Sequence, residues 1–262
     1  MAGLEQLRLI LSNLPGAVVA YSGGVDSALL AELAHQEAGA LVVTADSPSL
    51  PRRELDLAAA LAISRGWRHQ VVGTAELEDP NYAANPVNRC YHCKSALLDR
   101  LAPLGSPVLL GTVTDDLGDW RPGQRAATER GARHPMVEAG LSKADVREYS
   151  VALGLPTASK PASACLASRV AYGVPVTRSG LARVEEGEAF LDSLGFRVRR
   201  VRDLGGDAAR VEVGADELAR MVPLSTRVRA ELLALGFTSV RFDGYRRGAL
   251  NEGVVANQEV VA

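Results

Sequence analysis

Six residues between a buried strand and a helix carry the first chemical signal in the sequence. The stretch VVAYSGGVDSALLAELA runs from Val18 to Ala34, and its apolar start meets Ser22-Gly23-Gly24-Val25-Asp26-Ser27 just before a helical pattern begins. The first N–H groups of a helix are unpaired and carry the positive end of the helix dipole, so they attract anions. The two glycines permit close approach and a positive φ, and the two serines can donate hydrogen bonds to phosphate oxygens. This turn is predicted to bind phosphate.

The same turn contains a carboxylate and no lysine. Asp26 would repel a bare phosphate, so we expect a cation such as Mg²⁺ to bridge the two. The usual P-loop requires Gly-Lys-Ser/Thr. The turn at residues 22–27 lacks that lysine. This favours a reaction in which backbone amides hold pyrophosphate as the leaving group, rather than transfer of the γ-phosphoryl group. The alternative is a capped helix start with a tight turn and no ligand.

Three cysteines form the second signal. Cys90 and Cys93 lie in NRCYHCKSALLDRL, and Cys165 lies much later, in PASACLASRV. Residues three apart on a helix share a face with Cβ atoms about 5–6 Å apart, so the pair suits two irons of a cluster or one zinc ion. If Cys165 folds back onto the pair, three thiolates can bind a 4Fe–4S cluster and leave one iron open to sulfide. The alternatives are two buried helix cysteines or a redox pair.

The composition is that of an ordinary globular protein in a reducing compartment. The chain has 262 residues, 47% hydrophobic and 23% charged, with a net charge of −2, and nothing in that balance argues for nucleic acid. An odd number of cysteines argues against a disulfide framework. The N-terminus is too polar for a signal peptide, and no apolar run approaches the roughly 18 residues of a membrane span. We expect a soluble cytoplasmic protein with no nucleic-acid and no membrane partner.

The elements that must position these residues alternate along the first part of the chain. Strands are predicted at 17–21, 40–46, 67–73 and 107–112, and helices at 26–38, 51–66 and 86–102, after an amphipathic N-terminal helix. Strands that alternate with helices predict an α/β fold with a mostly parallel sheet and flanking helices. We assign this domain to residues 1–154.

The amino-acid composition changes after residue 154. Residues 155–176 are rich in Pro, Ala and Ser and are predicted to form an active-site linker that carries Cys165. Residues 177–262 are predicted to form a smaller C-terminal α+β domain, for substrate or oligomerisation, with a ferredoxin-like arrangement as one candidate. Its predicted elements are a helix at 178–194, strands at 196–202, 209–214 and 238–244, and helices within 215–235.

Two resemblances add to this interpretation. SGGVDS resembles the PP-loop of the ATP-pyrophosphatase superfamily, whose members adenylate a carboxyl or carbonyl oxygen and release pyrophosphate, and Gly111-Thr112 occupies the place of a second superfamily feature. RCYHCK, GTVTDDLGDWRPG, KPASACLASRVAYG and GYRRGALNE together resemble the LarE-type sulfur transferases, the pyridinium-3,5-bisthiocarboxylic acid mononucleotide synthases. The resemblance covers nearly the whole chain. One departure is Val113, where the family's usual Gly-Thr-Asn has its amide.

The resemblance implies an ATP-dependent sulfurtransferase and, as in the family, a homo-oligomer. ATP would adenylate a carboxylate of a small-molecule pyridinium mononucleotide, and sulfur would then replace oxygen to give a thiocarboxylate for the nickel-pincer cofactor of lactate racemase. Some members use a 4Fe–4S cluster on three cysteines, which match Cys90, Cys93 and Cys165. Others sacrifice the cysteine that matches Cys165. We favour the cluster, with Cys165 sacrifice as the alternative.

The remaining candidate residues are charged or lie at strand ends. Thr44 and Asp46, at the end of the second predicted strand, are expected near the adenosine. Arg169 directly follows CLAS and is expected to meet an anion of the substrate or, like Lys160, to steady the developing charge. Trp120, Arg121 and Pro122 are candidates for the substrate wall, with a packing loop as the alternative.

Alternation along FRVRRVR predicts which arginines of that strand serve the site. It places Arg200 and Arg202 on one face with apolar neighbours, which favours them as a paired anion site; a solvated strand is the alternative. Glu188 and Glu212 are candidates to bind a metal cation or to orient these arginines.

Three other functions are weighed against this one. A tRNA thiolase would share the loop and the three cysteines, but usually needs a basic RNA surface or an added RNA-binding domain. An amide-forming synthetase would explain the loop and not the cysteines. A non-catalytic nucleotide sensor with a structural metal would explain both without a reaction.

Overall fold

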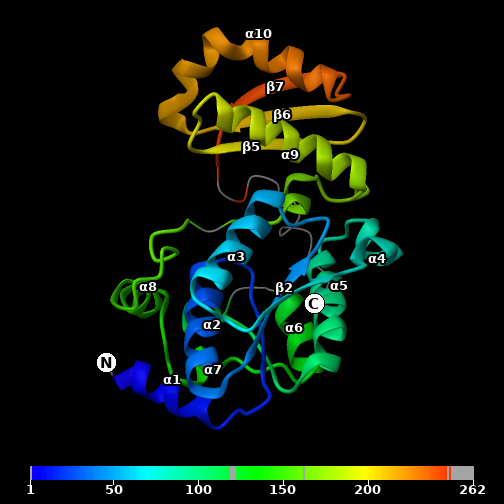
Figure 1. Cartoon of the computed structure of the whole chain (residues 1–262). Coiled ribbons are helices and arrows are strands. Elements are labelled where there is room, and N and C mark those ends of the chain that lie inside the picture. Colours follow the sequence, from blue (N-terminus) through cyan, green and yellow to red (C-terminus); the bar gives the residue numbers. More distant parts are fainter. Residues whose placement is uncertain (1, 119–121, 162, 247, 249–262) are drawn as a thin grey trace. The chain divides into compact units, whose positions relative to one another are not determined.

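The computed structural model describes residues 2–118, 122–161, 163–246 and 248, and the chain forms two compact units (Figure 1). The first unit contains Met1–Glu76 and Cys90–Ser163, and the second contains Leu77–Arg89 and Ala164–Ala262. Within the described ranges, no helix is both long enough and apolar enough to cross a bilayer.

The first unit is built on a four-stranded parallel sheet, which confirms the predicted α/β class. Its strands are β1 (Val18–Ala20), β2 (Leu41–Asp46), β3 (His69–Gly73) and β4 (Val108–Leu109), in the order β3-β2-β1-β4. The helices of this unit are α1 (Ala2–Ser12), α2 (Val25–Ala38), α3 (Arg52–Ser64), α5 (Arg89–Leu101), α6 (Pro122–Glu129), α7 (Pro135–Glu138) and α8 (Lys143–Ala152). Short 3₁₀ turns at Glu76–Glu78, Ala102–Leu104 and Thr114–Asp116 complete it.

The central strand β1 is covered on both faces of the sheet, which explains why it is continuously apolar in sequence. Val18 belongs to one core cluster with Leu98 and Leu101 of α5. Its neighbour Val19 belongs to another, with Leu7 of α1 and Leu29 of α2. Successive strand residues point to opposite faces, so a strand covered by helices on both sides has no polar side. The strand ends are therefore where polar chemistry can begin.

The second unit packs two helices on a three-stranded mixed sheet. Strands β5 (Arg199–Asp203) and β6 (Ala208–Val213) are antiparallel, and β6 and β7 (Ser239–Gly244) are parallel. Helices α9 (Arg178–Ser193) and α10 (Leu218–Ala234) contribute Leu191 and Leu232 to the core. A ferredoxin-like unit needs four strands, and the described residues of this sheet supply three. Shorter elements are α4 (Pro80–Ala83) and the 3₁₀ turns Leu166–Arg169 and Ala215–Glu217.

A segment from earlier in the chain anchors the stretch that carries Cys165. The buried side chain of Asn85 donates hydrogen bonds to the carbonyl oxygens of Ala171, at 2.8 Å, and Val174, at 2.9 Å. The N–H of Gly173 donates to the carbonyl of Asn85 at 3.0 Å. Residues 77–89 thus pack with the later residues, although they precede α5 of the first unit.

Candidate functional site

Residues 22–27 form the turn from β1 into α2. Gly23 has a φ of +75°, and Gly24 is the N-cap of α2 without a side-chain cap. The hydroxyl of Ser27 accepts a hydrogen bond from the Ser22 N–H at 3.2 Å and donates to the Gly24 carbonyl at 3.1 Å. The serine hydroxyls therefore brace the turn, and the start of α2 is left for a ligand.

Gly111, just beyond β4, lies against this turn so closely that a side chain does not fit. A Cβ atom at Gly111 would be 2.9 Å from the backbone nitrogen of Ser27 and 3.1 Å from the carbonyl carbon of Asp26. The next residue, Thr112, forms a 2.8 Å hydrogen bond through Oγ1 with Nδ1 of His134. The structure thus brings the predicted Gly-Thr pair to the turn, and packing gives a reason for the glycine.

Two lysines from distant parts of the first unit contact the turn. Nζ of Lys143, the first residue of α8, donates to Oδ2 of Asp26. Nζ of Lys160 donates to the carbonyl of Gly23 at 2.9 Å and lies 2.7 Å from the carboxylate of Glu54. Lys143 was not among the residues predicted for the site from sequence. Lys160 was predicted to steady the developing anion rather than to contact the nucleotide turn.

The second carboxylate oxygen of Asp26 suits a cation. Oδ1 is buried and has no hydrogen-bond partner among the described residues. A buried oxygen without a partner is costly, and hard carboxylate oxygens are what Mg²⁺ prefers. Oδ1 of Asp26 therefore offers one ligand of the kind that magnesium prefers, and the magnesium ion stays a prediction.

The residues predicted near the adenosine are engaged with neighbours. Thr44 is fully buried and its hydroxyl is 2.9 Å from Nε2 of His69, whose pKa is lowered by burial. Asp46 forms an ion pair with Arg52. Both lie near the carboxyl edge of the sheet, where open α/β sheets bind ligands.

The cysteines are thiols and belong to both units. Cys90 and Cys93 lie in the first turns of α5, and Cys165 precedes the turn Leu166–Arg169 in the second unit. Burial lowers the pKa of Lys94, next to Cys93, while the two thiols act in the opposite direction. In the part of the chain that the structure describes, no three His, Cys, Asp or Glu side chains form a group able to hold a metal ion. The three-cysteine cluster stays a prediction.

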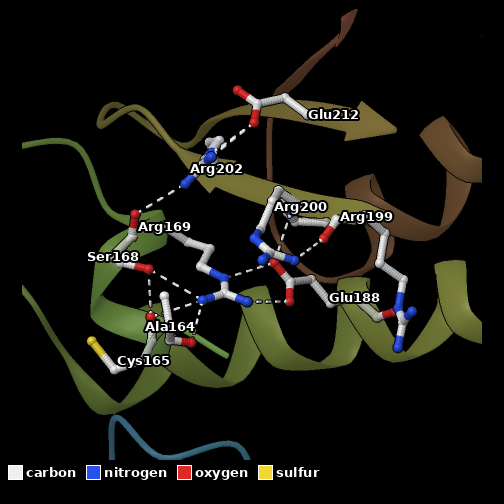
Figure 2. Close-up of polar contacts among 10 residues, drawn as sticks. Ala164, Cys165, Ser168, Arg169, Glu188, Arg199, Arg200, Arg202 and Glu212 are labelled. Atoms are coloured by element: carbon white, nitrogen blue, oxygen red, sulfur yellow. Dashed lines mark hydrogen bonds and ion pairs between the residues drawn. The ribbon is translucent and has the colours of Figure 1, made fainter. Parts of the chain in front are cut away.

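Arg169 holds the backbone of the Cys165 turn (Figure 2). Its side chain is nearly buried, with Nε and Nη2 donating to the two oxygens of Glu188 at 2.9 and 3.0 Å. Nη1 donates to the carbonyls of Ala164, at 2.5 Å, and Cys165, at 2.9 Å. Figure 2 shows the sulfur of Cys165 directed away from this guanidinium. Nη1 therefore holds the turn, while Nε and Nη2 fix the guanidinium to Glu188 of α9.

A second buried ion pair fixes the neighbouring strands. Arg202 donates to Glu212 at 2.9–3.0 Å and to the carbonyl of Ser168 at 3.0 Å. The other oxygen of Glu212 lies 3.0 Å from Nε of Arg210. Glu212 thus contacts Arg202, one of the two arginines it was predicted to orient. Glu188 pairs instead with Arg169. The role of both carboxylates as metal ligands stays a prediction.

Arg200 differs from the other two arginines. Nη1 donates to the carbonyl of Arg199 at 2.6 Å, and the guanidinium lies 5.5 Å from the ring centroid of Tyr245. No ion pair of Arg200 occurs within the described ranges. Burial lowers the pKa of Arg200, and the nearby charge of Arg169 lowers it further. An anion would relieve both effects.

Comparison with known proteins identifies the relatives of this chain. No family model matches it. It is 44% identical over 260 residues to an uncharacterized protein of Synechocystis, with 95% of this chain and 96% of that protein covered. It is 34% identical over 258 residues to the pyridinium-3,5-bisthiocarboxylic acid mononucleotide synthase of Lactiplantibacillus plantarum, covering 95% and 93% of the two chains. The chain belongs to the pyridinium-3,5-bisthiocarboxylic acid mononucleotide synthase family.

A more distant relative extends the comparison to an archaeon. An uncharacterized protein of Methanocaldococcus jannaschii is 27% identical over 228 residues, or 85% of this chain. Membership of the synthase family makes the chain an enzyme of the sulfurtransferase type. Of the candidate residues named from sequence, Trp120 and Arg121 lie outside the described residues.

Proposed function

We propose that this protein is an ATP-dependent sulfurtransferase that converts a carboxylate of a pyridinium dicarboxylate mononucleotide into a thiocarboxylate, for nickel-pincer cofactor synthesis. The observation that carries the proposal is 34% identity along 95% of the chain to a synthase named for such a product. The PP-loop chemistry is our inference from the turn at residues 22–27.

In the first step, a carboxylate oxygen of the substrate attacks the α-phosphorus of ATP. The bond from the α-phosphorus to the bridging oxygen breaks, and pyrophosphate leaves. The start of α2 has no side-chain cap, so its N–H groups are available to pyrophosphate oxygens. Asp26 would hold Mg²⁺, which supplies charge neutralisation at the phosphates when bound.

In the second step, a sulfur nucleophile attacks the acyl carbon and AMP leaves with the carboxyl oxygen. Cys90, Cys93 and Cys165 would hold a 4Fe–4S cluster, which when bound supplies a site for exogenous sulfide. Sacrifice of the Cys165 sulfur is the alternative. Arg169 keeps the Cys165 turn in place through its bonds to two turn carbonyls. Arg200 is the best candidate to bind a substrate phosphate or carboxylate, because its side chain is half-buried and forms no ion pair with any described carboxylate.

The decisive experiment supplies the protein, reconstituted with iron and sulfide under anaerobic conditions, with Mg–ATP and the pyridinium dicarboxylate mononucleotide. We expect AMP, pyrophosphate and a product whose mass shows sulfur in place of oxygen. A broad absorption band near about 400 nm would indicate the cluster, and a mass loss at Cys165 would indicate sacrifice. Thiolated tRNA in place of the pyridinium product would refute the proposal.

Variants of the cysteines separate the two sulfur sources. Cys90→Ser should abolish repeated turnover if a cluster carries the sulfide, and should leave a single turnover intact if Cys165 is consumed. Arg68→Gln is the control in the first unit, because Arg68 is exposed and lies directly before β3, outside the helix that carries Cys90 and Cys93.

A further inference from the structure

Lysine is rare in this chain, and two of its three lysines contact the turn at residues 22–27. Lys94, Lys143 and Lys160 are the three lysines among 29 basic Lys and Arg residues. The two at the turn are Lys143 and Lys160. The planar fork of arginine pairs with carboxylates and phosphates alike, whereas lysine is a compact point charge with three donors and is the residue that a P-loop uses to bind phosphate. A chain built almost wholly with arginine thus places lysine beside the turn that was predicted to bind phosphate.

The present partners of the two lysines are ones a phosphate can replace. Lys160 donates to a single carbonyl of the turn, at Gly23, and pairs with Glu54, and its side chain is 19% exposed. Lys143 pairs with one oxygen of Asp26, and the other oxygen is buried and finds no hydrogen-bond partner in the part of the chain that the structure describes. Asp26 is therefore not satisfied by Lys143 alone. The unpaired Oδ1 of Asp26 does not depend on the argument from the start of α2, and it indicates independently that a ligand binds here.

The backbone around the lysines is held in place. Arg147 donates to the carbonyls of Ala158, at 2.5 Å, and Lys160, at 3.1 Å. The cap of α8 is a reciprocal box between Ser142 and Asp145, which sets where Lys143 begins the helix. Both ammonium groups thus extend to the turn from fixed anchors, so their approach does not depend on a mobile segment.

We propose that Lys143 and Lys160 bind the pyrophosphate portion of ATP at residues 22–27 and replace the lysine that a P-loop carries within its own loop. The inference rests on the proposed use of ATP and adds the residues that bind its β- and γ-phosphates. When the nucleotide binds, Lys143 exchanges Asp26 for a phosphate oxygen, which leaves the Asp26 carboxylate to a cation. Lys160 keeps its contact with Gly23 and adds one to phosphate. The remote origin of both lysines explains why the loop motif has none.

The test measures binding rather than turnover. Isothermal titration calorimetry of Lys143→Gln and Lys160→Gln should show Mg–pyrophosphate and Mg–ATP binding about 10- to 100-fold more weakly than the wild type, as expected when a charged hydrogen bond is lost. Affinity for AMP, which lacks the β- and γ-phosphates, should change less than about twofold, and this also shows that the variants are folded. Arg130→Gln is the matched control, because it removes one positive charge from the same unit at an ion pair with Asp99.

The outcomes separate this inference from the proposed function. If the wild type binds Mg–pyrophosphate and both lysine variants bind it equally well, the inference is refuted while ATP-dependent sulfur transfer stands. If the wild type binds neither Mg–pyrophosphate nor Mg–ATP, both fail. Acetylation of the wild type with an N-hydroxysuccinimide ester gives a readout without substitution. Mg–pyrophosphate should slow modification of Lys143 and Lys160 at least fivefold, AMP should not, and equal rates at both lysines with and without Mg–pyrophosphate would refute the inference.

Discussion

Replacing Gly111 with alanine tests whether packing at the end of β4 sets the nucleotide turn. Gly111 has no positive φ, so alanine is compatible with the backbone, and the effect arises from the new methyl group alone. That methyl would meet the Ser27 nitrogen at 2.9 Å and the Ser27 Cα at 3.0 Å, whereas ordinary contacts begin at 3.4 Å. Both atoms are backbone, so the turn or the strand end must shift by about 0.5 Å to accept it.

The cost of such a shift can be estimated for stability and for binding. Overpacking of this kind costs about 1–3 kcal/mol, which urea unfolding monitored by fluorescence of the buried Trp67 would detect. A misplacement of about 1 Å costs about a hundredfold in rate, so half that shift should weaken ATP binding or slow adenylation about tenfold. Calorimetry with Mg–ATP and a pyrophosphate-release assay measure the two quantities.

The matched control is Gly73→Ala at the end of β3. Gly73 also ends a strand of the same sheet, yet a Cβ there meets nothing within 4 Å. Its stability and ATP affinity should therefore stay within about 0.5 kcal/mol of the wild type. If Gly111→Ala binds and adenylates like Gly73→Ala, the close packing at the turn is not what the site depends on, and the reasoning is wrong.

Three further predictions follow from buried charges. Glu212→Gln leaves two arginines at a nearly buried position without their carboxylate, and should destabilise the second unit by about 3–5 kcal/mol in urea unfolding; a smaller loss than 1 kcal/mol would contradict this. Burial and the charge of Lys94 lower the pKa of His134, so the unfolded chain binds more protons and stability should fall as pH drops below about 6.5. His134→Gln should flatten that fall between pH 7.5 and 5.5, and an unchanged slope would contradict it. Glu188→Gln removes the carboxylate that pairs with Arg169. It should slow sulfur transfer at least about tenfold, while ATP affinity stays within about twofold of the wild type. A parallel loss of sulfur transfer and ATP affinity would indicate general unfolding.

The helices and strands of the first unit could be predicted from the sequence, because each type of element has its own spacing of apolar residues. The alternation of apolar strands with amphipathic helices was confirmed as a parallel sheet flanked by helices. The fully buried Leu7 and Leu11 of α1 follow directly from helical spacing. The strand predicted over FRVRRVR, by contrast, begins only at Arg199. The N–H groups of the three preceding residues donate elsewhere: that of Phe196 to the carbonyl of Leu191 in α9, and those of Arg197 and Val198 to the carboxylate of Glu217.

The chemistry of short stretches could be predicted from the residues alone: a glycine turn before a helix, three thiols and one strand rich in arginine. Periodicity and motif spacing report contacts within a few residues, so no fold was needed to find them. The fold was needed to show that Lys143 and Lys160 reach the turn, that Gly111 leaves no room for a side chain, and that Arg169 pairs with Glu188. These contacts join residues far apart in the chain, and such pairs leave no local pattern, because only the packing of the elements brings them together.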